Sequence, residues 1–288
     1  MVPPPIEADL HGRTCVITGA SAGIGRATAS ELARLGARVV MAVRNPGKAE
    51  KVRRAIAKAT GSDALEVAFV DLARQDSIRA FARELATRHP QVDVLVNNAG
   101  IWTGRRQTSP DGIELTWATN VLGYVLVTHL LRPQLEAAGR ARIVNVASRY
   151  AGGLDLADVE FERRPWSGSD AYRQTKQANR MLTWALARRL AGTGVTANAM
   201  HPGFVSTEIF GKGGGGLGLS LSLYAKVRAR RPTEGADTVA WLAASPEVEG
   251  QSGLFWVDRG EHRCRFRDEA AEEELWRLCH RMVGSSTS

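Results

Sequence analysis

The sequence contains few cysteines and no long apolar run, and these absences exclude several classes of protein. Its 288 residues include three cysteines, Cys15, Cys264 and Cys279, an odd number without the spacing of a metal site. We therefore expect neither a disulfide-stapled secreted domain nor a bound metal. No run of about 18 apolar residues occurs, so no membrane-spanning helix is predicted. The first residues also lack the basic and apolar regions of a secretory signal, and the predicted location is cytoplasmic.

Aromatic residues are scarce among the basic clusters. The net charge is +8 and the predicted pI about 9.9, values that raise nucleic acid as a ligand. Clusters such as 228–231 and 263–267 are not interleaved with a series of stacking aromatics, and no nucleic-acid-binding motif accompanies them. We expect no nucleic-acid partner, because solvated faces and one anionic small ligand explain the charge more simply.

The chain does have a regular alternation of short β-branched runs and helical patterns. Strands are predicted at 13–18, 38–43, 65–70, 92–96, 142–147, 194–200 and 253–257, each followed by a helical pattern. This alternation predicts an α/β, single-domain Rossmann fold, with a doubly wound, seven-stranded parallel sheet in the order 3-2-1-4-5-6-7 and helices on both faces. Residues 13–283 are expected to form this domain, with a flexible arm at 1–12 and a tail at 284–288.

The first predicted strand runs into a glycine-rich turn, Gly19 to Gly25, and then into a helix. Glycines allow the backbone to approach a pyrophosphate, and the start of a helix offers free N–H groups and the positive end of a dipole. The spacing is Gly-x-x-x-Gly-x-Gly, not the commoner Gly-x-Gly-x-x-Gly. A turn with a purely structural role is the alternative.

The second strand ends at Val43 and is followed by Arg44 and Asn45, without an acidic residue. In a dinucleotide-binding unit, an acidic residue at this place hydrogen-bonds the 2′-hydroxyl of NAD, whereas an arginine suits the 2′-phosphate of NADP. The pattern favours NADP(H) over NAD(H). A solvated arginine that leaves the preference open is the alternative.

Tyr172 and Lys176 are four residues apart at the start of a long helical pattern, and so project from one face of the helix. An ammonium beside a phenol favours the phenolate and is expected to lower the pKa of the tyrosine. Such a phenol can give a proton to a carbonyl oxygen or take one from an alcohol. A half-buried ring with a solvated lysine is the alternative.

Further polar or small residues stand where predicted strands and helices meet the same edge of the sheet. Small residues at Asn97 to Gly100 are typical of a crevice for a flat cofactor. Asn120 is either held by neighbouring side chains or marks a break in its helix. Ser148 follows the fifth strand and can bind a substrate oxygen or simply open a loop.

A glycine-rich stretch, 211–218, is followed by the apolar segment 219–224. We interpret residues 207–230 as a mobile lid over a substrate pocket, with a surface linker as the alternative.

Together, these motifs resemble the short-chain dehydrogenases/reductases of the single-domain branch, over about residues 12–260. The resemblance depends on Thr18 to Gly25 (TGASAGIG), Asp71-Leu72, Asn97 to Gly100 (NNAG) and Pro202 to Thr207 (PGFVST), with Asn120, Ser148, Tyr172 and Lys176. Within the family the chain is most similar to the retinol-dehydrogenase-like group, through 111–115, 128–131, the insertion 154–169 and the tryptophan-bearing C-terminal segment. Unlike in the animal retinol dehydrogenases, no N-terminal membrane anchor is expected from this sequence.

The resemblance implies roles for individual residues. Tyr172 would be the acid/base, Lys176 would lower its pKa and hold the nicotinamide ribose, Ser148 would orient the substrate carbonyl, and the backbone carbonyl of Asn120 would hold a water. The implied cofactor-binding residues are Gly19, Ser21, Ala22, Gly23, Ile24, Gly25, Arg44, Asn45, Asp71, Leu72, Asn98, Ala99, Gly100, Tyr172, Lys176, Pro202, Gly203, Val205 and Thr207.

The expected activity is NADP(H)-dependent interconversion of a carbonyl and an alcohol on a hydrophobic small molecule. The expected substrate contacts are Ser148, Tyr150, Trp102, Phe204 and Phe210, most of them aromatic. The alternatives are a redox-initiated isomerisation or dehydration, and a catalytically idle cofactor-binding module. The helix that carries Tyr172 also presents apolar residues that suit either a homo-oligomer or core packing.

Overall fold

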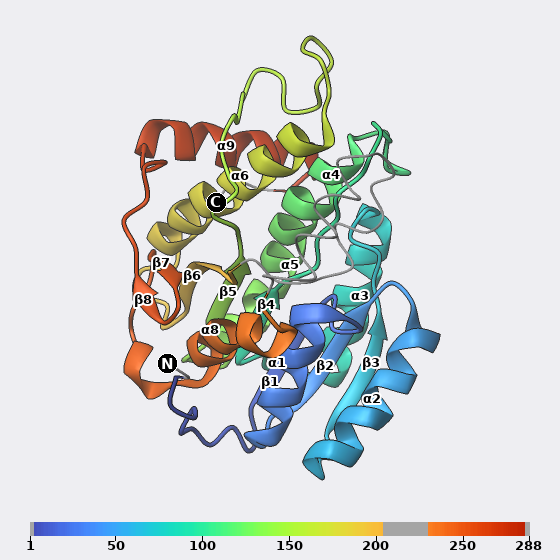
Figure 1. Cartoon of the computed structure of the whole chain (residues 1–288), viewed down its shortest axis with the longest axis vertical. Coiled ribbons are helices and arrows are strands. Elements are labelled where there is room, and N and C mark those ends of the chain that lie inside the picture. Colours follow the sequence, from blue (N-terminus) through green and yellow to red (C-terminus); the bar gives the residue numbers. More distant parts are fainter. Residues whose placement is uncertain (1–2, 204–229, 286–288) are drawn as a thin grey trace.

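The structure, a computed structural model, describes residues 3–203 and 230–285. A single twisted sheet has the strand order β3-β2-β1-β4-β5-β6-β7-β8, with helices on both faces (Figure 1). The strands are β1 (Thr14–Thr18), β2 (Arg38–Val43), β3 (Leu65–Phe69), β4 (Val94–Asn97), β5 (Arg142–Val146), β6 (Thr196–His201), β7 (Phe255–Val257) and β8 (Gly260–Glu261). The first seven are parallel, so the predicted Rossmann fold and its strand order are confirmed.

Helices form two layers, one on each face of the sheet. The helices are α1 (Gly23–Arg34), α2 (Pro46–Thr60), α3 (Gln75–Arg88), α4 (Leu115–Trp117), α5 (Gly123–Ala137), α6 (Gly168–Arg189), α8 (Pro232–Ala244) and α9 (Glu269–Met282). The core on one face joins side chains of α1, α2 and α8 to the sheet, and the core on the other joins α3, α5, α6 and α9. Because both faces are covered, a strand such as β1 is buried along its whole length.

The eighth strand was not predicted. β7 and β8 pair antiparallel through a two-residue turn, in which Asp258 and Arg259 both have positive φ, 52° and 60°. Turns of this kind usually contain Asn-Gly or Gly, so Asp-Arg gave no hairpin signal. Ion pairs hold the turn instead, from Asp258 to Arg230 and from Arg259 to Asp237.

The N-terminal arm is a second correction. Residues 3–12 were expected to be loosely attached, but Ile6 and Leu10 are buried in the core beside α1. The backbone N–H of Leu10 donates to the carbonyl of Leu35 at 2.8 Å. Two apolar side chains four positions apart therefore cover the end of α1, a tertiary contact that the polar, proline-rich start of the chain did not suggest.

α9 lies across α6 and reaches α3, so it covers part of the helical layer formed by α3, α5 and α6 (Figure 1). The residues that suited either oligomerisation or core packing, Met181, Trp184, Leu186 and Leu190, are all buried within this one chain. Arg188 and Arg189 hold α9 in place through Glu273, each with a nitrogen–oxygen distance of 2.9 Å. No helix in the described ranges is long and apolar enough to cross a membrane.

Candidate active site

The site lies at the carboxyl ends of the central strands. The chain runs outward from β1 to β2 and β3 and then returns to β4, so the strand order reverses between β1 and β4. A crevice at such a switch point is where dinucleotides bind in open α/β sheets. Thr18 ends β1, Asn97 ends β4, and Ser148 follows β5 by two residues.

The glycine turn after β1 has the geometry of a phosphate cradle. Gly19 has φ +70°, and a side chain there would lie 2.9 Å from the Cα of Ala99. A side chain at Gly25 would lie 2.5 Å from both the Asn98 amide nitrogen and the Gly19 carbonyl. α1 begins at Gly23, and its N-cap residue, Ala22, gives no side-chain cap to the first N–H groups. These residues fit a dinucleotide, because a bare backbone and uncapped N–H groups face the place where a pyrophosphate would lie.

Asn98 and Thr18 hold the ends of β1 and β4 together. The Thr18 hydroxyl accepts hydrogen bonds from the backbone N–H groups of Asn98 and Ala99, at 2.9 and 3.0 Å. The Asn98 amide in turn donates to the Thr18 carbonyl at 2.8 Å. The Asn98 side chain thus shapes the floor of the crevice next to Gly25.

The residues expected near the adenosine differ in how accessible they are. Arg44 is exposed directly after β2, where a 2′-phosphate would lie in a dinucleotide unit. The Asn45 side chain caps α2 by accepting from the Lys48 N–H at 2.9 Å. The Asp71 carboxylate accepts from the Ala73 N–H at 3.1 Å, and Leu72 is buried against Gly123. Arg44 keeps an exposed, charged side chain at this end of the crevice.

Tyr172 and Lys176 lie on the first turns of α6, which the Ser167 hydroxyl caps by accepting from the Asp170 N–H. They are 8% and 3% exposed. The Lys176 Nζ lies 5.5 Å from the centre of the Tyr172 ring and donates to the Val146 carbonyl at 2.9 Å. The solvated lysine considered as an alternative is therefore excluded.

Burial decides the charge state of this pair. It raises the pKa of the Tyr172 phenol to about 12, although a hydrogen bond with the Ser148 side chain lowers it in part. It lowers the pKa of the Lys176 ammonium to about 7. The expectation that Lys176 would lower the phenol pKa is not met in this structure, because removing both groups from water favours the neutral form of each.

Asn120 lies in a π-helical turn, Ala118–Leu122, between α4 and α5. Its side chain accepts from the Ile101 N–H at 2.8 Å and donates to the Ile101 carbonyl at 3.0 Å. The same amide lies 3.3 Å from the Thr175 hydroxyl on α6. Neighbouring groups therefore bind the Asn120 side chain, and a π-turn interrupts the helix there. Such turns are frequent at functional sites.

Ser148 and two aromatic rings, Trp102 and Tyr150, form the wall next to Tyr172. The Ser148 hydroxyl is buried and accepts from the Tyr150 N–H at 3.0 Å. The Trp102 ring stacks on Tyr172, with centroids 4.9 Å apart, and on Tyr150, with centroids 6.0 Å apart. Tyr150 is 48% exposed, so the stack runs from the buried phenol to the surface. This wall suits an apolar substrate surface.

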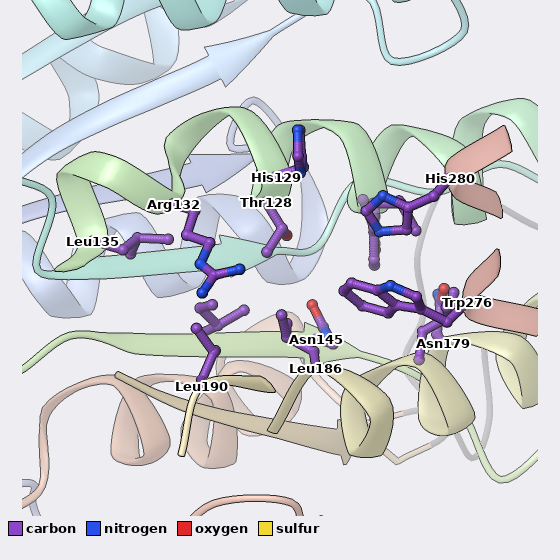
Figure 2. Close-up of a pocket in the computed structure, with 14 residues that line it drawn as sticks. Thr128, His129, Arg132, Leu135, Asn145, Asn179, Leu186, Leu190, Trp276 and His280 are labelled. Carbon is purple, nitrogen blue, oxygen red and sulfur yellow. The ribbon is translucent and has the colours of Figure 1, made fainter. Parts of the chain in front are cut away.

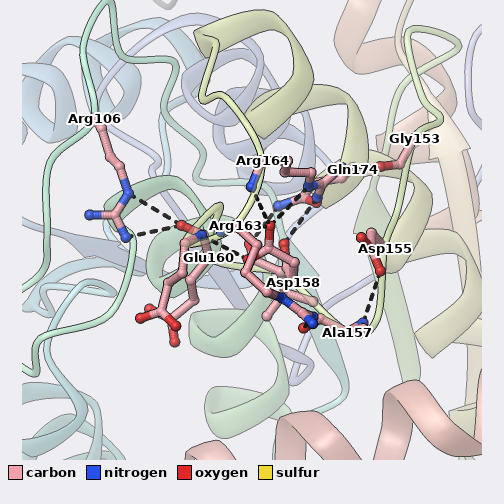
Figure 3. Close-up of polar contacts among 11 residues, drawn as sticks. Arg106, Gly153, Asp155, Ala157, Asp158, Glu160, Arg163, Arg164 and Gln174 are labelled. Carbon is pink, nitrogen blue, oxygen red and sulfur yellow. Dashed lines mark hydrogen bonds and ion pairs between the residues drawn. The ribbon is translucent and has the colours of Figure 1, made fainter.

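The insertion before α6 is organised around one buried carboxylate, as Figure 3 shows. Asp158 accepts from the backbone N–H groups of Glu162 and Arg164, at 2.7 and 3.1 Å. Burial raises its pKa, but these N–H donors and the Arg164 guanidinium outweigh burial and hold the pKa below its usual value. Gln174 ties the insertion to α6 by donating to the Val159 carbonyl at 2.7 Å. The loop therefore packs against the helix that carries Tyr172.

Some predicted residues cannot be placed. Pro202 and Gly203 follow β6, whereas Phe204, Val205, Thr207 and Phe210 lie outside the described residues, together with the proposed lid except Arg230.

The sequence analysis missed two buried residues next to the site. They are Arg180, one turn beyond Lys176, and Tyr124, whose ring centre lies 5.8 Å from the Lys176 Nζ. A cation four residues after Lys176, directly before the mostly apolar stretch 181–187, was the signal available for Arg180.

Comparison with known proteins agrees with this geometry. The model of the family "short chain dehydrogenase" matches residues 13–214. Human retinol dehydrogenase 14 is 39% identical over 295 residues, which cover 96% of this chain and 87% of the relative. An uncharacterized protein from Mycobacterium paratuberculosis has a TM-score of 0.80 at 31% identity, covering 98% of this chain and 97% of its own. The 3-ketoacyl-(acyl-carrier-protein) reductase from Brucella melitensis, solved with NADH, has a TM-score of 0.67 at 27% identity, covering 88% and 99%.

The match spans most of the chain and includes the glycine turn, the crevice and α6 with its tyrosine and lysine. The chain therefore belongs to the short-chain dehydrogenase family, as an oxidoreductase of the retinol-dehydrogenase-like group.

Proposed function

We propose that this protein is an NADP(H)-dependent oxidoreductase that interconverts a hydrophobic ketone or aldehyde and its alcohol, with Tyr172 as the acid/base. The observation that carries the proposal is the convergence of Ser148, Tyr172 and Lys176 beside the crevice that the glycine turn opens. The preference for NADP(H) is supported by the exposed Arg44 and the absence of an acidic residue at the end of β2.

The nicotinamide, when bound, supplies or accepts the hydride. The side chains supply orientation and the proton. In carbonyl reduction, the Tyr172 phenol donates its proton to the substrate oxygen, and the Ser148 hydroxyl donates a hydrogen bond to that oxygen as negative charge develops on it. A phenol whose pKa is about 12 is protonated at neutral pH, as this direction requires.

Lys176 is suited to return the proton. Its pKa of about 7 lets the ammonium form and the neutral amine both be populated near neutral pH. The Val146 carbonyl fixes the Nζ within the site, next to the Tyr172 ring. The family resemblance implies that this proton is exchanged with solvent at Asn120, where a π-turn interrupts the helix.

The substrate class is proposed from the wall of the site. Trp102 and Tyr150 extend the surface of Tyr172 outward, which favours a flat or elongated apolar molecule over a sugar. The name of the relative retinol dehydrogenase 14 points to such an alcohol. All-trans-retinal and para-nitrobenzaldehyde are therefore suitable carbonyl probes.

The test combines cofactor binding with turnover. NADPH and NADH are titrated by fluorescence into wild type and Arg44→Ala, and NADPH oxidation is then followed with both aldehydes. We expect tighter binding of NADPH that weakens in Arg44→Ala, and a loss of turnover of about 1,000-fold in Tyr172→Phe with NADPH binding retained.

Each arm can fail separately. Preferential binding of NADH would overturn the cofactor assignment. Turnover retained in Tyr172→Phe would overturn the role of the phenol. Binding of NADPH without turnover of either aldehyde would favour the isomerising or idle alternatives.

A further inference from the structure

Arg180 lies one helical turn beyond Lys176, on the side of α6 that faces Ser148. Its side chain comes from the catalytic helix, is 6% exposed, and belongs to no ion pair with a carboxylate in the described part of the chain. A buried cation without a carboxylate partner is destabilising unless its donors and its charge are satisfied in another way. In the structure, Nη1 and Nη2 of Arg180 have hydrogen-bond partners and aromatic rings lie against its charge, whereas its Nε has no partner.

Two aromatic rings and a thiol hold the guanidinium. Its carbon lies 3.8 Å from the centre of the Phe255 ring on β7 and 5.4 Å from that of Phe266, which precedes α9. Nη1 donates to the Cys264 sulfur at 3.3 Å. Contacts with ring faces favour a planar cation and fix the direction in which its nitrogens point.

The second terminal nitrogen of the guanidinium, Nη2, points to Ser148. Nη2 of Arg180 donates to the backbone carbonyl of Ser148, a charge-assisted bond in a buried environment. The same peptide group is held from its other side, because its N–H, that of Arg149, donates to the His201 Nδ1 at 3.1 Å. The backbone that carries the Ser148 hydroxyl is therefore fixed by Arg180 from α6 and by His201 from β6.

We propose that Arg180 is a positioning residue for the reaction, which holds the Ser148 hydroxyl against Tyr172 and links the segment 264–266 to the active site. The inference depends on the proposed function, since it assigns to Arg180 an effect on the serine and the tyrosine of that mechanism. Arg180 does not touch the substrate. It acts through the Ser148 carbonyl.

A specific electrostatic consequence follows. The hydrogen bond with Ser148 lowers the pKa of the Tyr172 phenol, against the larger effect of burial. Loosening Ser148 therefore raises that pKa further. Alcohol oxidation requires the deprotonated phenol, so the rise of its rate with pH moves to higher pH.

The experiment compares wild type, Arg180→Met and Arg180→Lys, with Arg188→Met as the matched control. Arg188 is also on α6, but it contacts Glu272 and Glu273 of α9 and not Ser148. Four quantities are measured: the kcat for para-nitrobenzaldehyde, the Kd for NADPH, the thermal midpoint, and the pH profile of all-trans-retinol oxidation.

For Arg180→Met we expect kcat to fall about 10- to 100-fold, with the Kd for NADPH changed by less than about twofold and the oxidation profile moved to higher pH. Arg180→Lys, which keeps a charged donor, should recover part of the loss. Arg188→Met should lower the thermal midpoint while kcat stays near that of wild type.

Wild-type kcat and pH profile in Arg180→Met would overturn the inference, and so would an equal loss of kcat in Arg188→Met. If Arg180→Met does not fold, Arg180→Lys decides: a loss of about threefold to tenfold in kcat at an unchanged Kd is expected, and wild-type behaviour would refute the inference. Tyr172→Phe separates the two proposals. If it remains active, the proposed function fails; if it is inactive while Arg180→Met is not, only the positioning role fails.

Discussion

The two ends of α6 use the same residue spacing for different purposes. Tyr172, Lys176, Arg180, Trp184 and Arg188 follow one another at intervals of four. Four residues advance the helix by about 40° beyond a full turn, so this row of side chains turns by about 160° around α6 from its first member to its last. The first three reach the crevice or Ser148, and the last two reach the C-terminal segment and α9.

The two ends also differ in what surrounds their polar groups. At the crevice end, Lys176 and Arg180 each donate to a backbone carbonyl. At the other end, a cavity of about 40 Å³ lies between α5, α6 and α9, with Asn145, Asn179, Trp276 and His280 among the residues of its wall (Figure 2). Both amide atoms of the buried Asn179 lack a hydrogen-bond partner there. The side of α6 beneath α9 therefore contains a small cavity, with the Asn179 amide in its wall.

The largest effect should come from removing the cation at the crevice end. Lys176→Met should lower turnover about 1,000-fold, because the proton that Tyr172 gives up could no longer be replaced through the amine. Steady-state reduction of para-nitrobenzaldehyde measures this effect. A variant that keeps more than about a tenth of wild-type turnover would contradict it.

The same substitution should stabilise the protein in a pH-dependent way. The pKa of Lys176 is about 7 in the folded chain, below the ordinary value of 10.5, so the unfolded chain binds more protons between these values. Wild type therefore gains stability relative to Lys176→Met as pH rises through this window. The advantage of the variant should be greatest near pH 7 and shrink by about 1.4 kcal/mol per pH unit. Urea unfolding of both proteins at several pH values measures the difference, and a constant difference would show that folding does not lower the pKa of Lys176.

A substitution at the end of α6 near α9 should change the free energy of unfolding and have much less effect on the reaction. Trp184 is 1% exposed, with the Arg267 guanidinium 4.3 Å from the centre of its ring. Trp184→Ala should cost about 3 kcal/mol of unfolding free energy through the cavity that it leaves. The Kd for NADPH should stay within about twofold of wild type, because the ring lies away from the crevice. Urea unfolding and a fluorescence titration measure the two quantities. A tenfold weaker Kd would show that the two ends of α6 are coupled.

The smallest expected effect is an increase in the free energy of unfolding. Asn179→Leu replaces an unpartnered buried amide by an apolar side chain of similar size, next to Leu182 and Leu186 in the cavity wall. The free energy of unfolding should rise by about 1 kcal/mol, with turnover unchanged. Calorimetry of the variant and wild type checks this value. Destabilisation would instead indicate that an ordered water in the cavity binds the amide.

The crevice was largely predictable because each of its motifs is local. The turn from Gly19 to Gly25, the pair Tyr172 and Lys176, and Ser148 after β5 each depend on a few neighbouring residues and on the end of a strand or helix. The electrostatics could not be predicted in the same way. Proximity predicted a lowered pKa for Tyr172, whereas the depth at which both groups are buried raises it.

The sequence by itself determined the order of strands and helices, and with it the edge of the sheet where the polar residues gather, because side-chain periodicity and turn chemistry act over a few residues. The tertiary structure alone decided the attachment of the N-terminal arm, the hairpin at Asp258 and Arg259, the cover of α6 by α9, and the contact from Arg180 to Ser148. The residues joined in these contacts are about 25 to more than 80 positions apart in the chain. Such contacts form when packing brings distant segments together, and no local pattern encodes them.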